Sequence, residues 1–213
     1  MSLRIKICGI TSVDDALVAV EAGADALGFM FCEASPRFIS FATAANIIGR
    51  LPPFVAKVGV FVDAPEELVR RAIMECHLDT LQFHGAEVPK YCSAFSLPVI
   101  KAFRMQGEKD VQALPACPAS AWLLDSFVPG RSGGTGATFN WDLARAAKEF
   151  GRPIILAGGL TVENVGEAVR KVQPFGLDVS SGVESKPGKK DSGKMRAFIL
   201  RARGGEDARQ RKP

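Results

Sequence analysis

The segment Arg4–Thr11 reads RIKICGIT, and its pattern decides how the rest of the chain is interpreted. In a strand, Ile5 and Ile7 point to one side while Lys6 and Cys8 point to the other, because successive side chains alternate. A charged face is unusual for a first strand in a buried sheet. It makes sense if that face lines the inside of a closed barrel. Cys8 then lies at the carboxyl end of the strand, where barrel enzymes place their chemistry.

The length and composition of the chain suit one α/β barrel. It has 213 residues, 47% of them hydrophobic and 23% charged, as expected for a soluble globular protein with a large core. No apolar run reaches the ~20 residues of a membrane-spanning helix. The first residues lack the basic and apolar regions of a signal peptide. We therefore expect a cytoplasmic protein with no membrane partner.

The basic balance of the chain comes mainly from its end. The formal net charge is +4, and residues 201–213 carry five basic and two acidic side chains, a net +3. From Gly204 onward the sequence is polar and has no apolar period, which predicts a disordered charged tail over residues 204–213. The rest of the chain shows no basic stripe. We therefore expect no nucleic-acid partner.

Cysteine and histidine usage argues against disulfides and metal sites. The five cysteines are odd in number and none forms a CxxC pair, so neither a disulfide framework nor a zinc site is indicated. The two histidines, His77 and His84, are too few and too poorly spaced for a metal cluster. Reduced thiols fit a cytosolic protein.

Short apolar segments alternate with amphipathic helical patterns along the chain. Eight of these segments are bounded by glycine, proline or polar residues, as strands are. They are Arg4–Cys8, Asp25–Met30, Val55–Val62, Thr80–Phe83, Pro98–Phe103, Ala121–Asp125, Pro153–Leu156 and Phe175–Ser180. The helical segments between them supply the crossovers that parallel strands need. The pattern predicts a single (β/α)8 TIM barrel over residues 1–203.

An open doubly wound sheet is the alternative architecture. Its glycine-rich fingerprint should follow the first strand, but only Gly9 stands there. The longest loops follow the second and sixth predicted strands, in Phe31–Phe41 and Ser126–Phe139. Barrels lengthen these carboxyl-end loops when they build a site. The second of them holds Gly133–Gly136, which is either a mobile lid or a plain flexible loop.

Two strand ends carry candidates for proton transfer. Asp125 ends the sixth predicted strand, where partial burial raises the pKa of a carboxyl group toward the working range; an N-cap or loop anchor is the alternative. Cys8 has the same place on the first strand. Free cysteine is commonly a small buried apolar residue, so catalysis would require nearby positive charge or a helix N-terminus to favour the thiolate.

The last two repeats resemble a phosphate cradle. Ala157-Gly158-Gly159-Leu160 joins a strand to a helix, and Ser181-Gly182 follows the eighth predicted strand. Glycines let the backbone approach a phosphate, and helix N-termini offer free N–H groups. Each segment alone could be a simple turn. Their joint position after strands seven and eight favours phosphate binding.

Further polar residues face the same predicted end of the barrel. Arg37 lies in the loop after the second strand, and its guanidinium suits a carboxylate or a phosphate; a solvated loop arginine is the alternative. His84 follows the fourth strand and is a candidate substrate-binding residue, or else a histidine anchored in the core. Lys6 and Asp178 share the inward phase of neighbouring strands and are expected to pair.

Eight motifs together resemble phosphoribosylanthranilate isomerase of tryptophan biosynthesis. They are KICGIT at Lys6–Thr11, GADALGFMF at Gly23–Phe31, SPR at Ser35–Arg37, LQFHG at Leu81–Gly85, LLDS at Leu123–Ser126, GGTG at Gly133–Gly136, AGGL at Ala157–Leu160 and DVSSGVE at Asp178–Glu184. They occur in the family's order and span residues 6–184. Phe83 stands where the family often has another apolar residue.

The resemblance implies an Amadori rearrangement of N-(5-phosphoribosyl)anthranilate to 1-(2-carboxyphenylamino)-1-deoxyribulose 5-phosphate, with no cofactor and no metal. It implies that Asp125 is the general acid at the ribose ring oxygen, and that Cys8 as thiolate is the general base at C2′. Arg37 would hold the anthranilate carboxylate. The backbone of the last two repeats would hold the phosphate, at Gly158, Gly159, Ser181 and Gly182. We expect a monomer or a homodimer.

Two rival functions follow from the same barrel. The related isomerase of histidine biosynthesis is the nearest, but resemblance to that family calls for aspartate on the first strand, where this chain has Cys8. A phosphate-binding regulator without catalysis is the other. That alternative is disfavoured because the acid and base positions, Asp125 and Cys8, are both filled.

Overall fold

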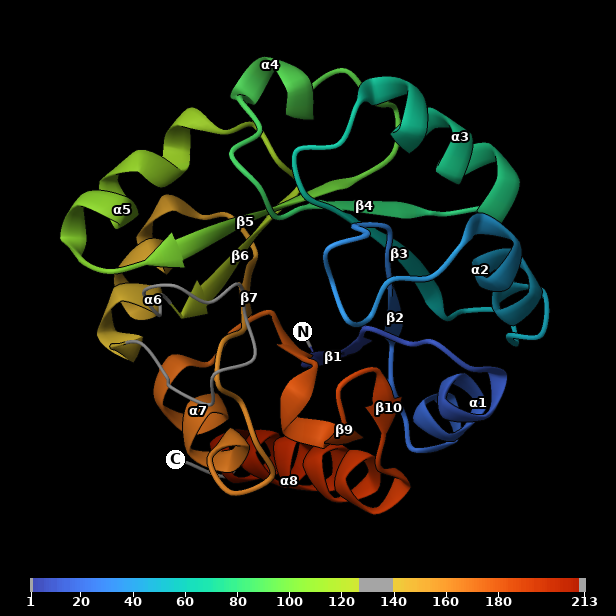
Figure 1. Ribbon diagram of the computed structural model, residues 1–213. Coiled ribbons are helices and arrows are strands. Elements are labelled where there is room, and N and C mark those ends of the chain that lie inside the picture. The colour runs from blue at the N-terminus through green and yellow to red at the C-terminus, as the bar shows by residue number, and fades with distance from the viewer. Residues whose placement is uncertain (1, 127–139, 211–213) are drawn as a thin grey trace.

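Eight parallel strands close into a barrel in the computed structural model, which describes residues 2–126 and 140–210, with side chains to residue 204. The strands follow chain order around the ring, and helices surround it (Figure 1). The barrel strands are β1 (Arg4–Cys8), β2 (Ala26–Met30), β3 (Ala56–Phe61), β4 (Thr80–Phe83), β5 (Val99–Met105), β6 (Ala121–Ser126), β7 (Ile154–Leu156) and β8 (Gly176–Val179). The predicted (β/α)8 fold is confirmed, and the open sheet is excluded.

The helices connect successive strands on the outside of the barrel. In the described residues they are α1 (Val13–Glu21), α2 (Phe41–Ile48), α3 (Glu66–Cys76), α4 (Pro89–Cys92), α5 (Glu108–Ala113), α6 (Trp141–Ala147), α7 (Val165–Val172) and α8 (Ser192–Gln210), with short 3₁₀ turns at Leu114–Ala116, Lys148–Phe150 and Ser181–Val183. Local sequence sets where they begin. The hydroxyls of Ser12 and Ser40 accept hydrogen bonds from the amides of Asp15 and Thr43, which caps α1 and α2.

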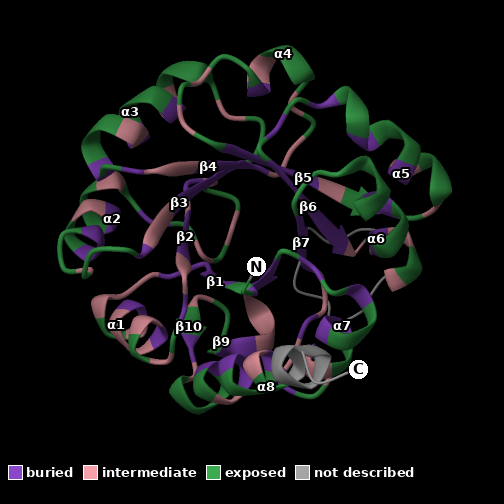
Figure 2. Ribbon diagram, turned by 180° about the vertical axis from the view of Figure 1, so that it is seen from behind, coloured by how far each residue is buried: buried purple, intermediate pink, exposed green. Residues whose placement is uncertain are grey.

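Two apolar cores lie on the two faces of the strands. The larger fills the space between the barrel and the helices, so the strands are buried while the outer helix faces are exposed (Figure 2). The smaller lies inside the barrel and is made of residues from β3, β5, β6 and β7 with Ala157. On the β1 side the barrel interior is polar instead, as the alternation in Arg4–Thr11 predicts.

Lys6 and Asp178 are polar residues that occupy the barrel interior on the β1 side. They stand opposite each other in the β1–β8 register, and Lys6 Nζ lies 2.9 Å from Asp178 Oδ1. Burial disfavours the ammonium, but Asp178 and, after it, Cys8 together more than offset this, and the pKa of Lys6 is raised above its ordinary value. The ion pair expected from their shared inward phase is therefore present. Removing one partner would leave a buried charge unpaired, which typically costs about 3–5 kcal/mol.

The end of the chain departs from a plain barrel. A hairpin of β9 (Glu184–Lys186) and β10 (Lys189–Lys190), absent from the sequence expectation, follows β8. Helix α8 then runs to Gln210, so its backbone extends into the segment expected to be a disordered tail. The division into a barrel of residues 1–203 and a tail of 204–213 stays a prediction. The candidate lid, Gly133–Gly136, lies outside the described residues.

In the described ranges, no helix has the length and apolar character needed to cross a membrane.

Candidate active site

A cavity of about 330 Å³ opens at the carboxyl ends of the barrel strands. Residues from β1, β4 and β6 and from the segments after β2, β7 and β8 contribute to its wall. Its lining includes every residue that the sequence proposes for the site: Cys8, Arg37, His84, Asp125, Gly158, Gly159, Ser181 and Gly182. The structure therefore brings together in one cavity residues that are distant in sequence. The roles of these residues stay predictions.

Cys8 is the last residue of β1 and is 6% exposed. Burial and, to a smaller extent, the carboxylate of Asp178 raise the pKa of its thiol, while the cations of Lys6 and Lys190 act in the opposite direction. Gly28 on β2 makes room for it, because a Cβ there would lie only 2.7 Å from Cys8 Sγ and 3.0 Å from Lys6 Cε. These cations stabilise a thiolate, but burial outweighs them, so the balance at this position favours the neutral thiol. Once ionised, it is a strong base facing the cavity.

Asp125 lies near the end of β6, is 8% exposed and has both carboxyl oxygens held. The amide of Ser126 donates to its Oδ1 at 2.8 Å, and His84 Nε2 lies 3.1 Å from its Oδ2. Gly158 closes over the same group, since a Cβ at its φ of 75° would lie 2.6 Å from Asp125 Oδ1. The carboxyl group is fixed from three sides and still lines the cavity.

Gln82 is a site residue that the sequence interpretation missed. It is 1% exposed inside the barrel, it lines the cavity, and it lies between Lys6 and His84. A signal was available, because strand alternation puts Gln82 on the same face as His84, two residues later. A buried amide at such a position requires polar partners.

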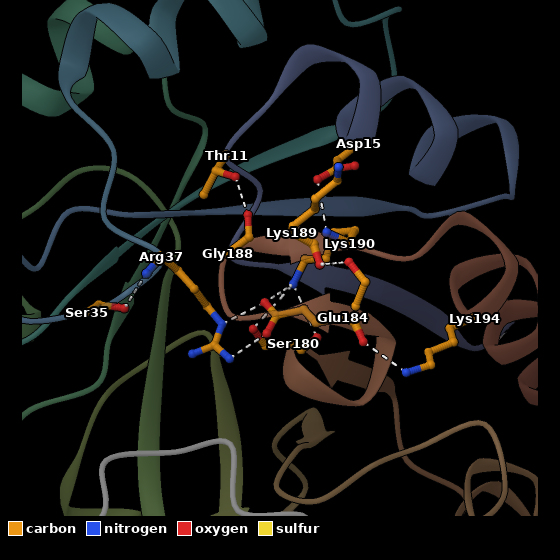
Figure 3. Close-up of polar contacts among 11 residues, drawn as sticks. Thr11, Asp15, Ser35, Arg37, Ser180, Glu184, Gly188, Lys189, Lys190 and Lys194 are labelled. Carbon is orange, nitrogen blue, oxygen red and sulfur yellow. Dashed lines mark hydrogen bonds and ion pairs between the residues drawn. The ribbon is translucent and has the colours of Figure 1, made fainter.

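Arg37 reaches the cavity from the loop after β2, but most of its guanidinium is already engaged. Its Nε and Nη2 donate to the two carboxylate oxygens of Glu184 at 2.8 and 2.7 Å (Figure 3). Buried Lys190 also donates to Glu184, at 2.9 Å. Burial opposes ionisation of Glu184, but the hydrogen bond from Arg37 and the charge of Lys190 prevail and lower its pKa. In the described residues this pairing leaves Arg37 Nη1 available to a ligand.

The hairpin after β8 contacts the loop after β1, the first turn of α1 and the loop after β2. The hydroxyl of Thr11 donates to the carbonyl of Gly188, and the carboxylate of Asp15 accepts from the amide of Lys190 at 3.0 Å (Figure 3). A side chain at Gly188 would meet the carbonyl of Pro36 at 2.8 Å. The residues around Arg37 are therefore positioned by contacts across the chain. In the sequence Glu184 is only the last residue of the DVSSGVE motif, and no local pattern predicts its pairing with Arg37.

The glycines after β7 and β8 allow the two loops to pack against each other. Gly158 and Gly159 have φ of 75° and 62°, in the left-handed region that favours glycine. A Cβ on Gly182 would lie 1.9 Å from the carbonyl oxygen of Leu160, so no side chain fits there. These loops present bare backbone to the cavity, next to Ser181. Such an arrangement suits a phosphate.

Similarity to known proteins points to a single family of enzymes. The family model described as N-(5′-phosphoribosyl)anthranilate (PRA) isomerase matches residues 5–201. The N-(5′-phosphoribosyl)anthranilate isomerase of Geobacter sulfurreducens is 54% identical over 202 residues, which cover 95% of this chain and 99% of the relative.

Two solved structures extend the comparison. A crystal structure of a phosphoribosyl anthranilate isomerase in complex with reduced 1-(o-carboxyphenylamino)-1-deoxyribulose 5-phosphate is 41% identical, with a TM-score of 0.86 over 95% of this chain and 100% of that one. A crystal structure of monomers generated from the dimeric enzyme of Thermotoga maritima is 40% identical, with the same TM-score and coverage. The family model, the close relative and the shared barrel agree: the chain belongs to the N-(5′-phosphoribosyl)anthranilate isomerases, enzymes of tryptophan biosynthesis.

Proposed function

We propose that the chain carries out the Amadori rearrangement of its family with Asp125 as the general acid and Cys8 as the general base. One observation carries this assignment: a carboxyl group from β6 and a thiol from β1 line the same cavity. Strands one and six are well separated around the ring. An acid and a base placed in this way can act on different parts of one bound sugar.

The chemistry then proceeds by proton transfer from Asp125, proton transfer to Cys8 and a tautomerisation that moves the proton of the C2′ hydroxyl to C1′. Asp125 gives its proton to the ribose ring oxygen, the C1′–O bond breaks, and the anthranilate nitrogen supplies the electron pair for a protonated C=N bond. The Cys8 thiolate removes the C2′ proton, and the C–H electrons form an enolamine. Tautomerisation protonates C1′ and leaves a ketone at C2′. Product and substrate are isomers, so no cofactor enters this balance.

Binding at both ends of the substrate completes the proposal. Arg37 Nη1 would contact the anthranilate carboxylate, while its other nitrogens are held by Glu184. The phosphate would bind to the backbone at Gly158, Gly159, Ser181 and Gly182. His84 borders the same space but is bonded to Asp125. Fixing both ends lowers the entropic cost of bringing the sugar to the two catalytic groups.

Replacing Arg37 with lysine tests the carboxylate contact. Lysine keeps the charge but cannot donate to Glu184 with two nitrogens and to a ligand with a third. We expect KM to rise about 10- to 100-fold, the effect of one charge-assisted hydrogen bond, with a smaller change in kcat. Glu184→Gln should raise KM in the same direction, because it weakens the hold on Arg37. An unchanged KM in Arg37→Lys would rule out the contact.

The activity is tested by the fate of N-(5′-phosphoribosyl)anthranilate in the presence of the purified chain. Its fluorescence should disappear, and a product of unchanged mass should form that takes up two hydrogen atoms on borohydride reduction, as a ketone does. Release of free anthranilate would instead indicate hydrolysis. That outcome would contradict the isomerisation.

A second proposal concerns self-association: the chain forms a homodimer through the amino-terminal end of its barrel. A dimeric enzyme is known among its relatives. Phe54, just before β3, is wholly exposed and has a φ of 70°. The backbone of a bulky residue is strained at positive φ. Exposure of the apolar aromatic ring to water is also unfavourable. A partner that buries this ring would compensate for both costs.

Sedimentation equilibrium distinguishes the two oligomeric states. The wild-type protein should sediment with twice the 22.8 kDa mass of a single chain. Phe54→Ser should sediment with the mass of a single chain. Met74→Ser, which alters another exposed apolar side chain, serves as the control and should stay dimeric. A wild-type chain of single mass would contradict the proposal.

The cytoplasm is the proposed location. All five cysteines lie among the described residues and each is a free thiol, which suits a reducing compartment.

A further inference from the structure

A continuous row of polar side chains crosses the barrel interior and ends on the proposed general acid. It runs from Asp178 through Lys6, Gln82 and His84 to Asp125, with successive contacts of 2.9, 2.8, 3.0 and 3.1 Å. All but His84 are at most 8% exposed. Burying four polar groups in an otherwise apolar interior costs folding free energy unless each has a hydrogen-bond partner.

The direction of each hydrogen bond follows from its first member. The Lys6 ammonium has three donors and no acceptor, so the atom of Gln82 that faces it at 2.8 Å must be the carbonyl oxygen. With the amide flipped, its NH₂ group would point at an ammonium group. The oxygen is therefore fixed toward Lys6, and the NH₂ group is fixed toward His84.

The orientation of the Gln82 amide determines which ring nitrogen of His84 carries the proton. Gln82 Nε2 can only donate, so His84 Nδ1, 3.0 Å away, accepts and carries no proton. The ring proton is then on Nε2, which lies 3.1 Å from Asp125 Oδ2. Protonating Nδ1 as well would set two donors against each other. The row therefore selects the neutral tautomer that donates to Asp125.

We propose that Gln82 and His84 are positioning residues that hold Asp125 in its acid role, with Lys6 as the group that fixes the polarity of the row. The His84 donor at Oδ2 and the Ser126 amide at Oδ1 orient the carboxyl group. Both donors also stabilise the carboxylate that is left after its proton has gone to the sugar. The row of polar side chains thus stabilises the Asp125 carboxylate that develops in the transition state. This raises kcat rather than substrate affinity.

Gln82→Glu is the sharpest test, because it changes polarity without changing shape. A carboxylate at position 82 still accepts from Lys6 but cannot donate to His84, so the His84 proton should move to Nδ1. We expect kcat to fall about 10- to 100-fold, as for loss of one hydrogen bond to a charged group, with KM within about twofold of wild type.

Nitrogen-15 NMR of the imidazole rings reads the tautomer directly. The chain has only two histidines, and the exposed His77, which ends α3 with a φ of 53°, can be replaced by asparagine to assign the spectrum without touching the site. Wild type should show a bare Nδ1 and a protonated Nε2 at His84. The opposite tautomer, or an imidazolium, at pH 7.5 would overturn the inference. So would an unchanged kcat in Gln82→Glu.

A second pair of variants covers the case in which Gln82→Glu fails to fold. His84→Gln can place an amide donor near the position of Nε2, whereas His84→Leu cannot donate. The glutamine variant should keep at least about ten times the kcat of the leucine variant. Equal kcat values in the two would show that His84 acts only through packing, and would overturn the proposal.

The inference rests on the proposed role of Asp125, but the two can fail separately. The tautomer is measured without turnover, so it stands or falls on the hydrogen-bond row alone. Loss of the acid assignment would appear in variants of Asp125 itself and would leave the spectrum of His84 unchanged.

Discussion

Cys8→Ala is expected to lower kcat by about 10²- to 10⁴-fold, the usual contribution of a positioned general base. Alanine removes the Sγ that faces the cavity beside Lys6 and Lys190, and no other group on β1 takes its place. Binding of a phosphorylated substrate analogue should change by less than about threefold, because the phosphate loops and Arg37 are left intact. Steady-state kinetics and calorimetric titration of the same preparation separate these two effects.

Cys32 supplies the matched control for that experiment. It is also a free thiol on the wall of the cavity, but it lies beyond the end of β2 and no role is assigned to it. Cys32→Ala should keep kcat within about twofold of wild type. If Cys8→Ala retained more than a tenth of the wild-type kcat, the thiol would not be the base.

Asp125→Asn is expected to reduce kcat by a similar factor, about 10²- to 10⁴-fold. An amide has nearly the shape of a carboxyl group but cannot give up a proton as an acid does. It also has only one acceptor oxygen, whereas Asp125 accepts at two, from Ser126 and from His84. The variant therefore loses both the acid and part of its alignment.

Asp142→Asn is a suitable control for the loss of a carboxylate. Asp142 lies exposed on α6 and contacts Arg145 at 3.4 Å, a surface pair of little energetic weight. Its variant should match wild type in kcat and in melting temperature. Turnover by Asp125→Asn above a tenth of the wild-type kcat would remove the acid assignment.

The fold could be predicted because its signals are local. Each strand is an apolar segment closed by glycine, proline or polar residues, and the longer helices have an apolar period. The observed strands therefore differ from the expected ones by at most two residues at either end. The position of Cys8 and Asp125 also follows from local information. A residue at the carboxyl end of any barrel strand faces the same opening.

Apart from the Lys6–Asp178 pair, which follows from strand phase, the contacts between distant segments could not be predicted from the sequence pattern. Nothing in the loop around Arg37 indicates that two of its guanidinium nitrogens donate hydrogen bonds to Glu184, 147 positions later. The β9–β10 hairpin was missed because its strands have three and two residues, too few for a period to show. Gln82 could have been found, since it shares the inward face of β4 with the mouth residue His84, but a single glutamine gives no hint of Lys6 on the other side of the barrel.

The most direct test of the account compares three purified chains in one assay. Initial rates of loss of N-(5′-phosphoribosyl)anthranilate fluorescence are measured for wild type, Cys8→Ala and Asp125→Asn, with circular dichroism to verify that all three are folded. The account predicts turnover by wild type and a loss of at least about 10² in kcat in each variant. Consumption of the substrate at wild-type rate by either folded variant would contradict it.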